Sequence, residues 1–369
     1  MPRDLHSPRA TLAGQSFSRI LIVKPSSLGD VVHALPVLHG LRTRYPQATI
    51  DWLVNSSLAP LIEEHPQLSR IVPFDRRRYA RLASDPKAAR DFARFVRELR
   101  KRKYEVVIDL QGLFRTGFLA WASGAPVRIG FRDAREGARF FYTHRLQVDD
   151  PNMHAVDRNY LAASMLGFAD VPIVFEIGLT DRLRREAAGL LRDNGAAEGR
   201  PVAVVAPGAR WETKRWPAER FAETIDALQA TSERRVVLVG GPDEYDLCAR
   251  IAALCQSTPI VLAGQTSLRQ LAAVIELADV VLCHDSGAMH LAAALGRPLL
   301  CLTGPTNPRR TGPYRRLDDV LRVDLDCSPC YLRRLSRCHH DHQCMLGLDT
   351  KQVIARAQAL LERDVVRSC

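Results

Sequence analysis

The sequence predicts an α/β protein built from two doubly wound parallel sheets, and the pattern of apolar residues supports this prediction in two ways. Apolar, β-rich runs alternate with segments of helical periodicity, and the alternation restarts after about residue 178. Short continuous runs such as Val202-Ala-Val-Val205 are typical of strands that are buried on both faces. Two successive series of this kind predict two domains, 1–178 and 179–369.

Each series contains five predicted strands separated by helical segments. We expect strands at 19–24, 48–54, 70–74, 104–109 and 127–131, and then at 202–206, 235–240, 259–263, 279–283 and 298–303. The stretch from Val171-Pro172 to Thr180-Asp181 predicts a linker leading into a capped helix, and a last helix is expected from about Thr350 to Arg363. Ligands of such sheets bind at the carboxyl ends of the strands, so the loops that follow strands carry the candidate site residues.

The composition is that of a soluble globular protein with 46% hydrophobic and 25% charged residues. No apolar run approaches the roughly 18 residues that a membrane-spanning helix needs. The N-terminal run Ile20-Leu21-Ile22-Val23 is too short for a signal-peptide core and is followed by Lys24. We therefore expect a cytoplasmic protein.

The net charge of +11 is concentrated in residues 69–103, which hold thirteen Lys/Arg against four Asp/Glu. Part of this segment predicts a helix, with Asp85 as cap, Pro86 at the first position and an apolar stripe at Phe92, Phe95, Val96 and Leu99. The charges fit either a solvated helix face or contact with an anionic partner, such as a phosphorylated lipid surface, an acidic glycan or nucleic acid. Arg76, Arg77 and Arg78 lie outside the striped helix and are the better candidates for ligand contact.

Nine cysteines in a chain of cytoplasmic character indicate thiols rather than a disulfide framework. Four of them are close in sequence and are interspersed with histidines: Cys327, Cys330, Cys338 and Cys344, with His339, His340 and His342. A zinc knuckle and a reduced structural loop both fit this segment, although its spacing matches no finger or ribbon pattern well.

The loop Asp285-Ser286-Gly287-Ala288-Met289-His290 follows a predicted strand and leads into a helical pattern. Backbone N–H groups at a helix start attract anions, phosphates above all. Asp285 can accept from hydroxyl groups, Ser286 can cap the helix, and Gly287 allows a ligand to approach the backbone. A capped helix without a ligand explains the same pattern.

Two further loops carry chemically capable side chains. Asp30 follows the first predicted strand, in Pro25-Ser26-Ser27-Leu28-Gly29-Asp30, where Gly29 permits a tight turn. Its carboxylate fits a helix cap or a general base. Lys214 lies in the strand-to-helix loop that ends at Pro217, where an ammonium suits a departing diphosphate, although it also fits an ordinary surface position.

Other strand-end loops add weaker candidates. Glu244 follows Gly240-Gly241 and can accept hydrogen bonds from a nucleoside, and Thr266 lies in a similar turn. The Pro in Gly304-Pro305-Thr306-Asn307 favours a structural turn. In the first series, Gln111, Arg115 and Arg132 follow strands and could receive an acidic acceptor, or be merely solvated.

Taken together, these loops make the sequence similar to the bacterial lipopolysaccharide heptosyltransferases, glycosyltransferase family 9. The resemblance covers about 19 to 350 and is carried by KPSSLGDVVHALPVL (24–38), DLQGLFRTG (109–117), WETKRWP (211–217), GGPDE (240–244) and DSGAMHLAAALGRP (285–298). The first motif is most similar to heptosyltransferase I, whereas Cys327-Ser328-Pro329-Cys330 resembles heptosyltransferase II.

The resemblance implies a GT-B fold, in which two Rossmann-like domains face a cleft. It implies ADP-L-glycero-D-manno-heptose as donor, bound by the C-terminal domain, and the octulosonic acid of lipid A as acceptor, bound by the N-terminal domain. The donor residues implied are Ala209, Arg210, Lys214, Glu244, Thr266, Asp285, Ser286, Gly287 and His290, with backbone contacts at Ala209-Arg210, where relatives carry hydroxyl residues. The acceptor residues expected are Ser27, Gly29, Arg76, Arg77, Arg78, Gln111, Arg115 and Arg132.

The implied reaction inverts the anomeric centre, with Asp30 as the base and Lys214 stabilising the leaving diphosphate. No metal or cofactor is required by this scheme. The basic segment would meet the lipid acceptor at the cytoplasmic face of the inner membrane. A glycosyltransferase that uses another nucleotide-sugar or a later core acceptor fits the same motifs. A nucleic-acid-binding protein does not, because Phe92 and Phe95 are expected to be buried and the strand-end loops would lack a role.

Overall fold

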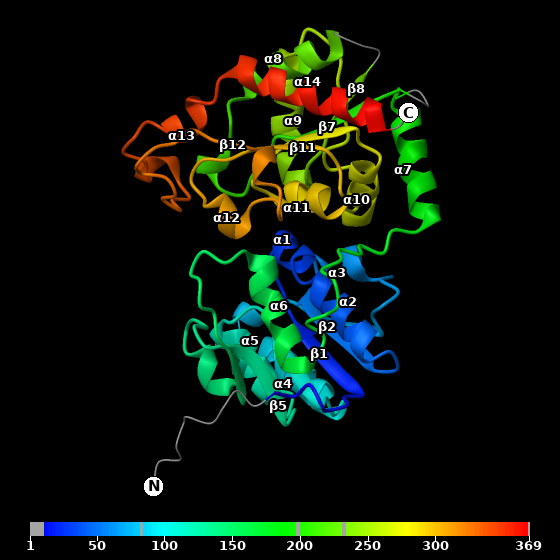
Figure 1. Ribbon diagram of the computed structural model, residues 1–369, viewed down its shortest axis with the longest axis vertical. Coiled ribbons are helices and arrows are strands. Elements are labelled where there is room, and N and C mark those ends of the chain that lie inside the picture. The colour runs from blue at the N-terminus through cyan, green and yellow to red at the C-terminus, as the bar shows by residue number, and fades with distance from the viewer. Residues whose placement is uncertain (1–10, 82–83, 197–199, 231–233, 368–369) are drawn as a thin grey trace. The chain divides into compact units, whose positions relative to one another are not determined.

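The computed structural model describes residues 11–81, 84–196, 200–230 and 234–367. The chain divides into two compact units, Met1–Gly178 and Leu179–Cys369 (Figure 1). Each unit is built around a six-stranded parallel sheet. The predicted α/β fold class is therefore confirmed.

The sheet of the N-terminal unit has the strand order β3-β2-β1-β4-β5-β6. Its strands are β1 Arg19–Val23, β2 Thr49–Asn55, β3 Arg70–Phe74, β4 Val106–Asp109, β5 Val127–Phe131 and β6 His144–Leu146. Its helices are α1 Leu28–Val32, α2 Leu35–Arg44, α3 Ala59–Ile62, α4 Pro86–Lys101, α5 Phe114–Ala122 and α6 Ala155–Leu166, with short 3₁₀ turns η1 Arg78–Arg81 and η2 Ala138–Phe141.

The sheet of the C-terminal unit repeats this topology, with the order β12-β11-β10-β7-β8-β9. Its strands are β7 Val202–Ala206, β8 Arg235–Leu238, β9 Ile260–Val261, β10 Val280–His284, β11 Leu299–Leu302 and β12 Val320–Leu321. Its helices are α7 Asp181–Asp193, α8 Ala218–Ala230, α9 Tyr245–Leu254, α10 Leu268–Glu276, α11 Gly287–Ala294, α12 Pro308–Thr311, α13 Gln343–Leu346 and α14 Thr350–Arg367. The 3₁₀ turns η3 Glu212–Lys214 and η4 Pro242–Glu244 follow β7 and β8.

Both sheets have the doubly wound order in which the chain starts in the centre and reverses direction once. The reversal lies between β1 and β4 in the first sheet and between β7 and β10 in the second. At such a switch point the two flanking loops diverge to opposite faces and leave a crevice, which is where doubly wound proteins bind ligands.

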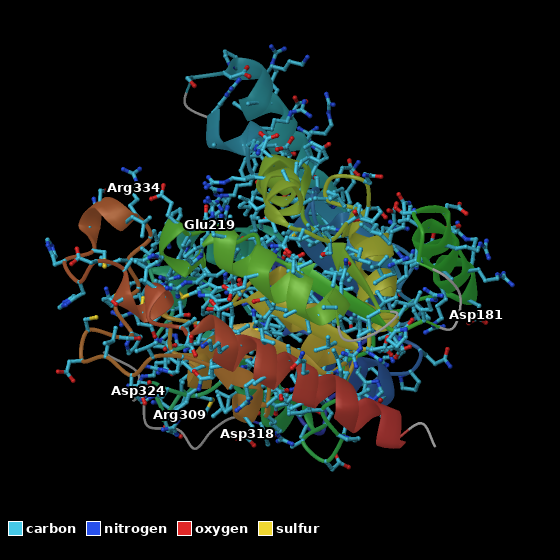
Figure 2. The ribbon with its side chains drawn as sticks, turned by 90° about the horizontal axis from the view of Figure 1, so that it is seen from above. Asp181, Glu219, Arg309, Asp318, Asp324 and Arg334 are labelled. Carbon is cyan, nitrogen blue, oxygen red and sulfur yellow. The ribbon has the colours of Figure 1, made fainter. Side chains whose placement is uncertain are left out.

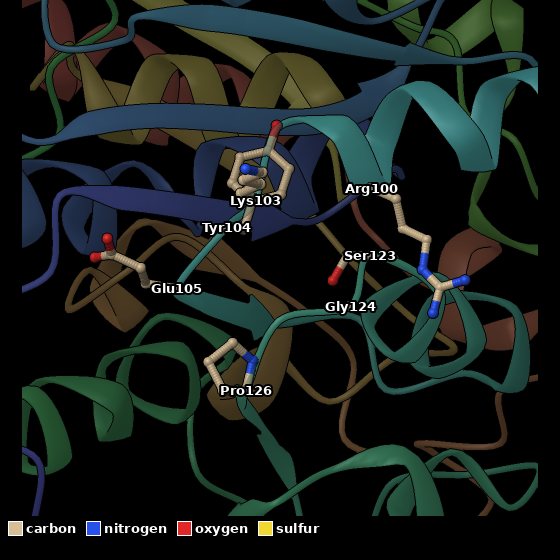
Figure 3. A pocket seen from close by; sticks show the side chains of 7 residues that line it. All are labelled: Arg100, Lys103, Tyr104, Glu105, Ser123, Gly124 and Pro126. Atoms are coloured by element: carbon tan, nitrogen blue, oxygen red, sulfur yellow. The ribbon is translucent and has the colours of Figure 1, made fainter.

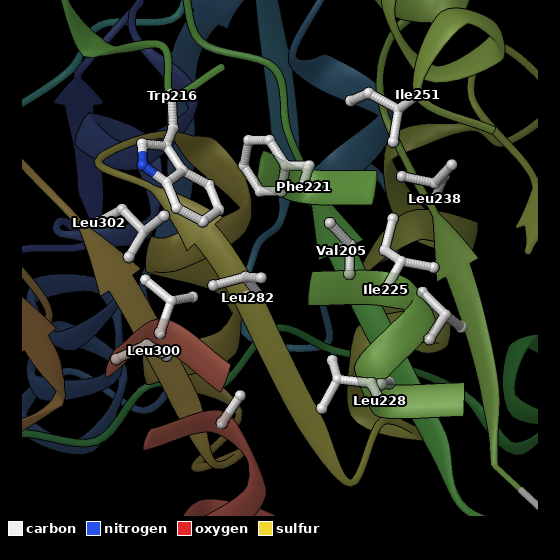
Figure 4. Close-up of a cluster of buried hydrophobic side chains, with 14 of the residues drawn as sticks. Val205, Trp216, Phe221, Ile225, Leu228, Leu238, Ile251, Leu282, Leu300 and Leu302 are labelled. Atoms are coloured by element: carbon white, nitrogen blue, oxygen red, sulfur yellow. The ribbon is translucent and has the colours of Figure 1, made fainter. Parts of the chain in front are cut away.

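The core of the C-terminal unit shows why these runs form buried strands. Val205, Leu282 and Leu300 lie on neighbouring strands and pack with Phe221 and Ile225 of α8 (Figure 4). Each fully buried side chain of this size contributes roughly 1.5–3 kcal/mol relative to exposure. The last predicted helix is present as α14, and it packs on α8.

All ten predicted strands are present, but two further strands were not predicted. β6 is the three-residue segment His144-Arg145-Leu146, and β12 has only two residues. Both are edge strands, which need an apolar pattern least because one side has no neighbouring strand. Their short length, and in β6 the polar residues His144 and Arg145, left no periodic signal.

The predicted starts of two helices are confirmed in detail. Asp85 caps α4 by accepting a hydrogen bond from the Lys87 N–H, and Pro86 is its first residue. Thr180 caps α7 in the same way, because its hydroxyl oxygen accepts a hydrogen bond from the Leu183 N–H. Within the described residues, no helix combines the length and apolar character that crossing a bilayer requires.

Candidate functional site

The switch point of the C-terminal sheet brings a lysine and an aspartate together. Lys214 ends η3 in the loop after β7, and Asp285 directly follows β10. The Lys214 Nζ lies 2.8 Å from the Asp285 Oδ2 and 3.1 Å from the Asp285 carbonyl oxygen. The two side chains are only 14% and 8% exposed, so Lys214 is not an ordinary surface lysine.

A third loop, after β11, also contacts Asp285. The Thr306 hydroxyl donates to the Asp285 Oδ2 over 2.6 Å and lies 3.1 Å from the Thr303 Oγ1. The turn at 304–307 therefore supports Asp285 through Thr306, which agrees with the structural role that its Pro favours. Asp285 accepts from a turn hydroxyl, as its place in the sequence predicted.

The Lys214 ammonium also lies over an aromatic ring. Its Nζ is 4.6 Å from the centroid of the Trp211 ring, and the guanidinium carbon of Arg333 is 5.1 Å from the same centroid. Cations at these distances are attracted by the ring quadrupole. Trp211 and Asp285 together therefore hold the lysine side chain in one place.

Buried His284 fixes Trp216 near the end of the loop between β7 and α8, which carries Lys214 and which we call the lysine loop. Burial lowers the pKa of His284 to about 3, so its ring is neutral near pH 7. The Nε2 atom then accepts a hydrogen bond of 2.9 Å from the Trp216 backbone N–H. Trp216 also packs edge-on against Phe221 in the core. The loop between β7 and α8 is therefore anchored at two points, at Lys214 by Asp285 and at Trp216 by His284 and Phe221.

The start of α11 differs from the prediction at one residue. Ser286 occupies the N-cap position, but its side chain makes no capping hydrogen bond, so the prediction that its hydroxyl caps the helix is wrong. Its backbone is fully extended there (φ −144°, ψ −179°). Gly287 begins the helix, and His290 is buried one turn later.

Glu244 approaches the backbone of the loop after β7. Its Oε2 accepts from the Gly241 N–H over 2.9 Å, and a Cβ placed on Gly208 would lie 1.9 Å from its Oε1. Burial raises the pKa of Glu244 against the opposing effects of the Gly241 N–H and Arg215. The absence of a side chain at Gly208 therefore leaves the space that the Glu244 carboxylate occupies.

Replacing Gly208 with alanine should therefore force Glu244 to move. We expect the free energy of unfolding to fall by about 1–3 kcal/mol, the usual cost of overpacking a tight site. Gly189 in the middle of α7 is the matched control, since its Cβ would meet only the Arg192 Nη2 at 3.8 Å. Gly189→Ala should instead raise the stability by about 0.5–1 kcal/mol. Urea denaturation of both variants measures the difference, and equal effects would contradict this account.

The remaining donor-side candidates lie at the same edge of the sheet. Buried Ala209 follows β7 and uses its carbonyl oxygen to accept from the Arg215 Nε over 2.9 Å, whereas Arg210 is exposed. Thr266 is half-buried in the turn after β9. Gly264 of the same turn lies close to the backbone of Pro242, which follows β8. Five adjacent strands therefore send the candidate residues to one edge.

In the N-terminal unit, Asp30 lies at the switch point between β1 and β4. Its Oδ2 accepts from the Ser27 N–H over 2.6 Å and lies 3.0 Å from the Ser27 Oγ. Its Oδ1 lies 3.3 Å from the Nζ of Lys24, whose side chain is almost fully buried. Gly29 has helical backbone inside α1, and the contacts between Ser27 and Asp30 lie at the start of this helix.

These contacts determine the charge state of Asp30. Burial raises its pKa, but the Lys24 ammonium and the Ser27 hydrogen bonds more than offset this effect, and the pKa lies below its ordinary value. The side chain remains 35% exposed. Asp30 is therefore an ionised, partly accessible carboxylate near pH 7, held in one orientation.

Lys24 was not among the predicted site residues. Its Nζ also donates to the Leu110 carbonyl oxygen over 2.7 Å, which joins the end of β1 to the end of β4. The sequence offers one signal for it: a lysine that ends an otherwise apolar buried strand needs a partner for its charge.

Gln111 is brought next to the Asp30 loop, as predicted for a shared site. Its Oε1 accepts from the Ser26 N–H over 3.4 Å. Buried Asp109 shapes this turn by accepting from the Gln111 and Gly112 N–H groups and from the Tyr142 hydroxyl. Ser27, Asp30 and Gln111 thus form one cluster.

The predicted acceptor arginines are spread more widely along this sheet edge. Arg76, Arg77 and Arg78 are exposed beyond the edge strand β3, and Arg78 forms an ion pair with Asp91 of α4. Arg115 is exposed on α5, and Arg132 follows β5, where it donates to the Gln147 side chain. The structure does not bring these five residues into contact with Asp30.

The cysteine-rich segment packs against the lysine loop. The Thr213 hydroxyl donates to the Leu332 carbonyl oxygen over 2.5 Å, and the Nε2 of His342 lies 2.8 Å from the Thr213 carbonyl oxygen. Burial, together with Cys330, Cys338 and Cys327, raises the pKa of Cys344 to about 11. Among the described residues, no three His, Cys, Asp or Glu side chains come together in a way that could hold a metal ion, so this arrangement does not support the zinc-knuckle hypothesis.

A surface depression of about 480 Å³ lies elsewhere in the N-terminal unit (Figure 3). It is lined by residues that precede β4 and β5: Arg100, Lys103, Tyr104, Glu105, Ser123, Gly124 and Pro126. These residues lie where the strands begin, which is the sheet edge opposite to Asp30. The depression is therefore not part of the candidate site.

Comparisons with known proteins identify the family of this chain. The family model described as Glycosyltransferase family 9 (heptosyltransferase) matches residues 92–339. Lipopolysaccharide heptosyltransferase 1 of Pseudomonas aeruginosa is 32% identical over 315 residues, 85% of this chain and 86% of that protein. Lipopolysaccharide heptosyltransferase 2 of Salmonella typhimurium is 26% identical over 362 residues, 94% of this chain and 100% of that protein.

A solved structure supports the same assignment. E. coli heptosyltransferase WaaC with ADP matches with a TM-score of 0.73 at 27% identity, covering 93% of this chain and 99% of that one. The two doubly wound units have the GT-B fold of this neighbour. The chain therefore belongs to glycosyltransferase family 9, the heptosyltransferases, and is a glycosyltransferase.

Proposed function

We propose that this enzyme transfers L-glycero-D-manno-heptose from ADP-heptose to the octulosonic acid residue of lipid A, with inversion at the anomeric carbon. The observation that carries the proposal is the position of two charged side chains at two switch points. Asp30 lies at the switch point of the first sheet, and Lys214 lies at that of the second. The identity with lipopolysaccharide heptosyltransferase 1 supports this choice of sugar and acceptor.

The C-terminal unit binds the donor in this proposal. Lys214 and the free N–H groups at the start of α11 contact the diphosphate, because both are positive and both lie beside Asp285. The loops after β7, β8 and β9, with Ala209, Arg210, Glu244 and Thr266, hold the nucleoside. His290 and Ser286 complete the donor loop.

The N-terminal unit binds the acceptor and supplies the base. Asp30 is ionised, so it can remove the proton from the attacking hydroxyl as the bond to the anomeric carbon forms and the ADP leaves from the opposite face. Ser27, Gln111 and the exposed arginines contact the acidic acceptor. The transition state has oxocarbenium character, so charge on the leaving phosphate must be neutralised, and each donor there contributes on the order of 3 kcal/mol. The scheme uses no metal ion or cofactor.

We place the reaction at the cytoplasmic face of the inner membrane, with the enzyme bound peripherally, because the acceptor is lipid-linked. The surplus of Lys/Arg in 69–103 supports contact with acidic lipids. Residues 82–83 of that segment lie outside the described residues. The aromatic residues of its helix, Phe92 and Phe95, are half-buried and packed against Tyr79 and Phe74, so they do not offer base-stacking surfaces.

A second candidate is transfer to a later core residue. It is favoured by the similarity to heptosyltransferase 2, which covers a larger share of the chain, and by the Cys327-x-x-Cys330 element. The donor loop does not distinguish these acceptors, because it belongs to the other unit.

Release of ADP tests the function directly. Purified enzyme should release ADP from ADP-heptose when octulosonic acid-bearing lipid A is added, and should do so more slowly with an acceptor that already carries the first heptose. Faster release with the heptosylated acceptor would replace the first candidate with the second. No release with either acceptor would contradict both.

The contact between Lys24 and Asp30 predicts a change in pH dependence. Activity requires ionised Asp30, so kcat/KM should fall only when the pH drops through its lowered pKa. Lys24→Met removes the ammonium but leaves the burial that raises the pKa, so the acid limb should move to higher pH. Lys351→Met, on the surface of α14, should leave the limb in place. An unchanged limb in folded Lys24→Met enzyme would show that the ion pair does not set this pKa.

A further inference from the structure

The N-terminal unit exposes aromatic side chains that a soluble surface normally buries. Phe114 and Trp121 of α5 are each 52% exposed, and Phe140 of η2 is 72% exposed. Exposed apolar patches of this kind mark sites of interaction with a protein or a membrane.

The aromatic side chains of α5 form one continuous patch with Phe141 of η2. Phe114, Phe118 and Trp121 are spaced by four and three residues on α5, so they share one helix face. The Phe141 ring joins them, with its centroid 5.4 Å from Phe114, 6.3 Å from Phe118 and 6.4 Å from Trp121. We call Phe114, Phe118, Trp121 and Phe141 the aromatic patch; exposed Phe140 directly precedes Phe141 in the sequence.

The elements that carry the aromatic patch, and the helix α4 that packs beside α5, have a surplus of positive charge, which we call the basic rim. In total, α4, α5 and the segment 132–145 carry eleven Lys/Arg against four Asp/Glu. Three of the four acids are already paired: Asp91 with Arg78 and Arg94, Glu98 with Lys101, and Asp133 with Arg158. The Arg139 guanidinium lies over the Phe140 ring, 4.9 Å from its centroid.

The basic rim continues past the C-terminal end of α5. Arg100 and Lys103 line the depression of Figure 3, together with Ser123 and Gly124, which directly follow the helix. By contrast, the C-terminal unit is close to electrically balanced, with 26 Lys/Arg against 23 Asp/Glu. Figure 2 labels residues of both signs on it: Asp181, Glu219, Arg309, Asp318, Asp324 and Arg334.

We propose that the aromatic patch and its basic rim dock the enzyme on an anionic lipid bilayer, with Phe114 and Trp121 entering the headgroup region. Aromatic rings suit the membrane interface, and Lys/Arg around them attract acidic lipids. The positive charge of the basic rim is complementary to acidic lipid headgroups, which favours a bilayer surface over a neutral apolar partner. This inference rests on the proposed function, which requires a lipid-linked acceptor.

The position of the patch fits that requirement. Phe114 lies three residues after Gln111, whose side chain contacts Ser26 in the Asp30 loop. A bilayer bound at α5 would therefore hold a lipid-anchored sugar near the candidate base.

Vesicle binding tests the proposal without donor or acceptor. The full-length enzyme should cosediment with vesicles of phosphatidylglycerol and phosphatidylcholine, less so at high salt, and poorly with phosphatidylcholine alone. Phe114→Ala/Trp121→Ala should lower the partition coefficient at least about tenfold. The control Leu254→Ala/Leu317→Ala removes side chains that are 44% and 48% exposed on the C-terminal unit and should change little. Equal partitioning of the two double variants would overturn the proposal.

Fluorescence locates the contact independently of the alanine variants. Bromine-labelled lipids quench tryptophan only at the bilayer, and Trp121 is the tryptophan among the exposed large hydrophobic residues described. Wild type should be quenched, whereas Trp121→Phe should bind vesicles with little quenching. Quenching that persists in Trp121→Phe would place the contact elsewhere and overturn the proposal.

The two proposals fail in different ways. Phe114→Ala/Trp121→Ala should still release ADP at the wild-type rate with a delipidated, water-soluble acceptor, so loss of vesicle binding alone leaves the proposed transfer intact. A wild type without ADP release refutes the transfer, whatever the vesicles show. If the double variant abolishes self-association in sedimentation and vesicles bind neither protein, the patch is a protein interface and the membrane proposal is wrong.

Discussion

Replacing Asp30 with alanine should lower kcat by about 10²–10⁴-fold, the usual contribution of a positioned general base. The variant loses the ionised carboxylate that Lys24 and Ser27 hold in one orientation. The Kd for ADP should not change, because Asp30 belongs to a different compact unit from the donor loops. Turnover is measured as ADP release, and ADP binding by calorimetry.

Asp30→Asn is the matched variant for this prediction. An amide keeps the size of the side chain and an oxygen that can accept from Ser27, but it cannot take up the proton. It should therefore be about as inactive as Asp30→Ala, again by roughly 10²–10⁴-fold. Near-normal turnover of either variant would remove Asp30 from the role of base.

Replacing Lys214 with alanine should damage both binding and turnover. In the proposed mechanism the ammonium contacts the diphosphate in the ground state and the developing charge in the transition state, so ADP affinity should fall and kcat should drop by about 10²–10³-fold. The variant also leaves the buried Asp285 carboxylate with Thr306 but without its cation. Calorimetry with ADP and initial-rate kinetics with ADP-heptose separate the two effects.

The control for Lys214 is Lys351→Ala, which removes the same charge from the surface of α14. It should alter neither ADP affinity nor turnover. Lys214→Arg keeps the charge but replaces a point charge by a wider planar group, so it should recover part of the ADP affinity. If Lys214→Ala bound ADP as tightly as wild type, the lysine would not contact the diphosphate.

The fold was largely predictable because buried parallel strands leave a strong local signal. β5 and β7 begin and end at the predicted residues, and in β7 Val and Ala fill both faces of the buried strand. β6 escaped prediction because its register with β5, rather than its own sequence His144-Arg145-Leu146, makes it a strand. An edge strand such as β6 forms because it pairs with its neighbour, and the residue pattern of a single segment does not reveal that pairing.

The candidate site was predictable only as far as each loop could be interpreted alone. Asp30, Lys214 and Asp285 were identified from their places after strands, and the structure gives each a specific partner. Thr306 and Lys24 were missed because their partners are distant in sequence: Thr306 contacts Asp285 from the neighbouring strand, and Lys24 donates to Leu110. These contacts depend on strand order, which local patterns do not contain.

The aromatic patch shows the same limit. Periodicity places Phe114, Phe118 and Trp121 on one face of α5, but a stripe of this kind is normally the face that packs into the core. Its exposure depends on tertiary packing, because Phe92 of α4 and Phe141 of η2 contact Phe118, whereas Phe114 and Trp121 remain exposed.

A crystal structure of the enzyme with a fluorinated, unreactive ADP-heptose and the lipid A acceptor tests the central claim most directly. We predict that the Asp30 carboxylate lies within hydrogen-bond reach of the acceptor hydroxyl, about 3 Å away, on the face of the sugar opposite ADP. Lys214 should contact the diphosphate in the same complex. A complex in which the anomeric carbon lies beside another carboxylate, with Asp30 separated from the acceptor, would contradict the account.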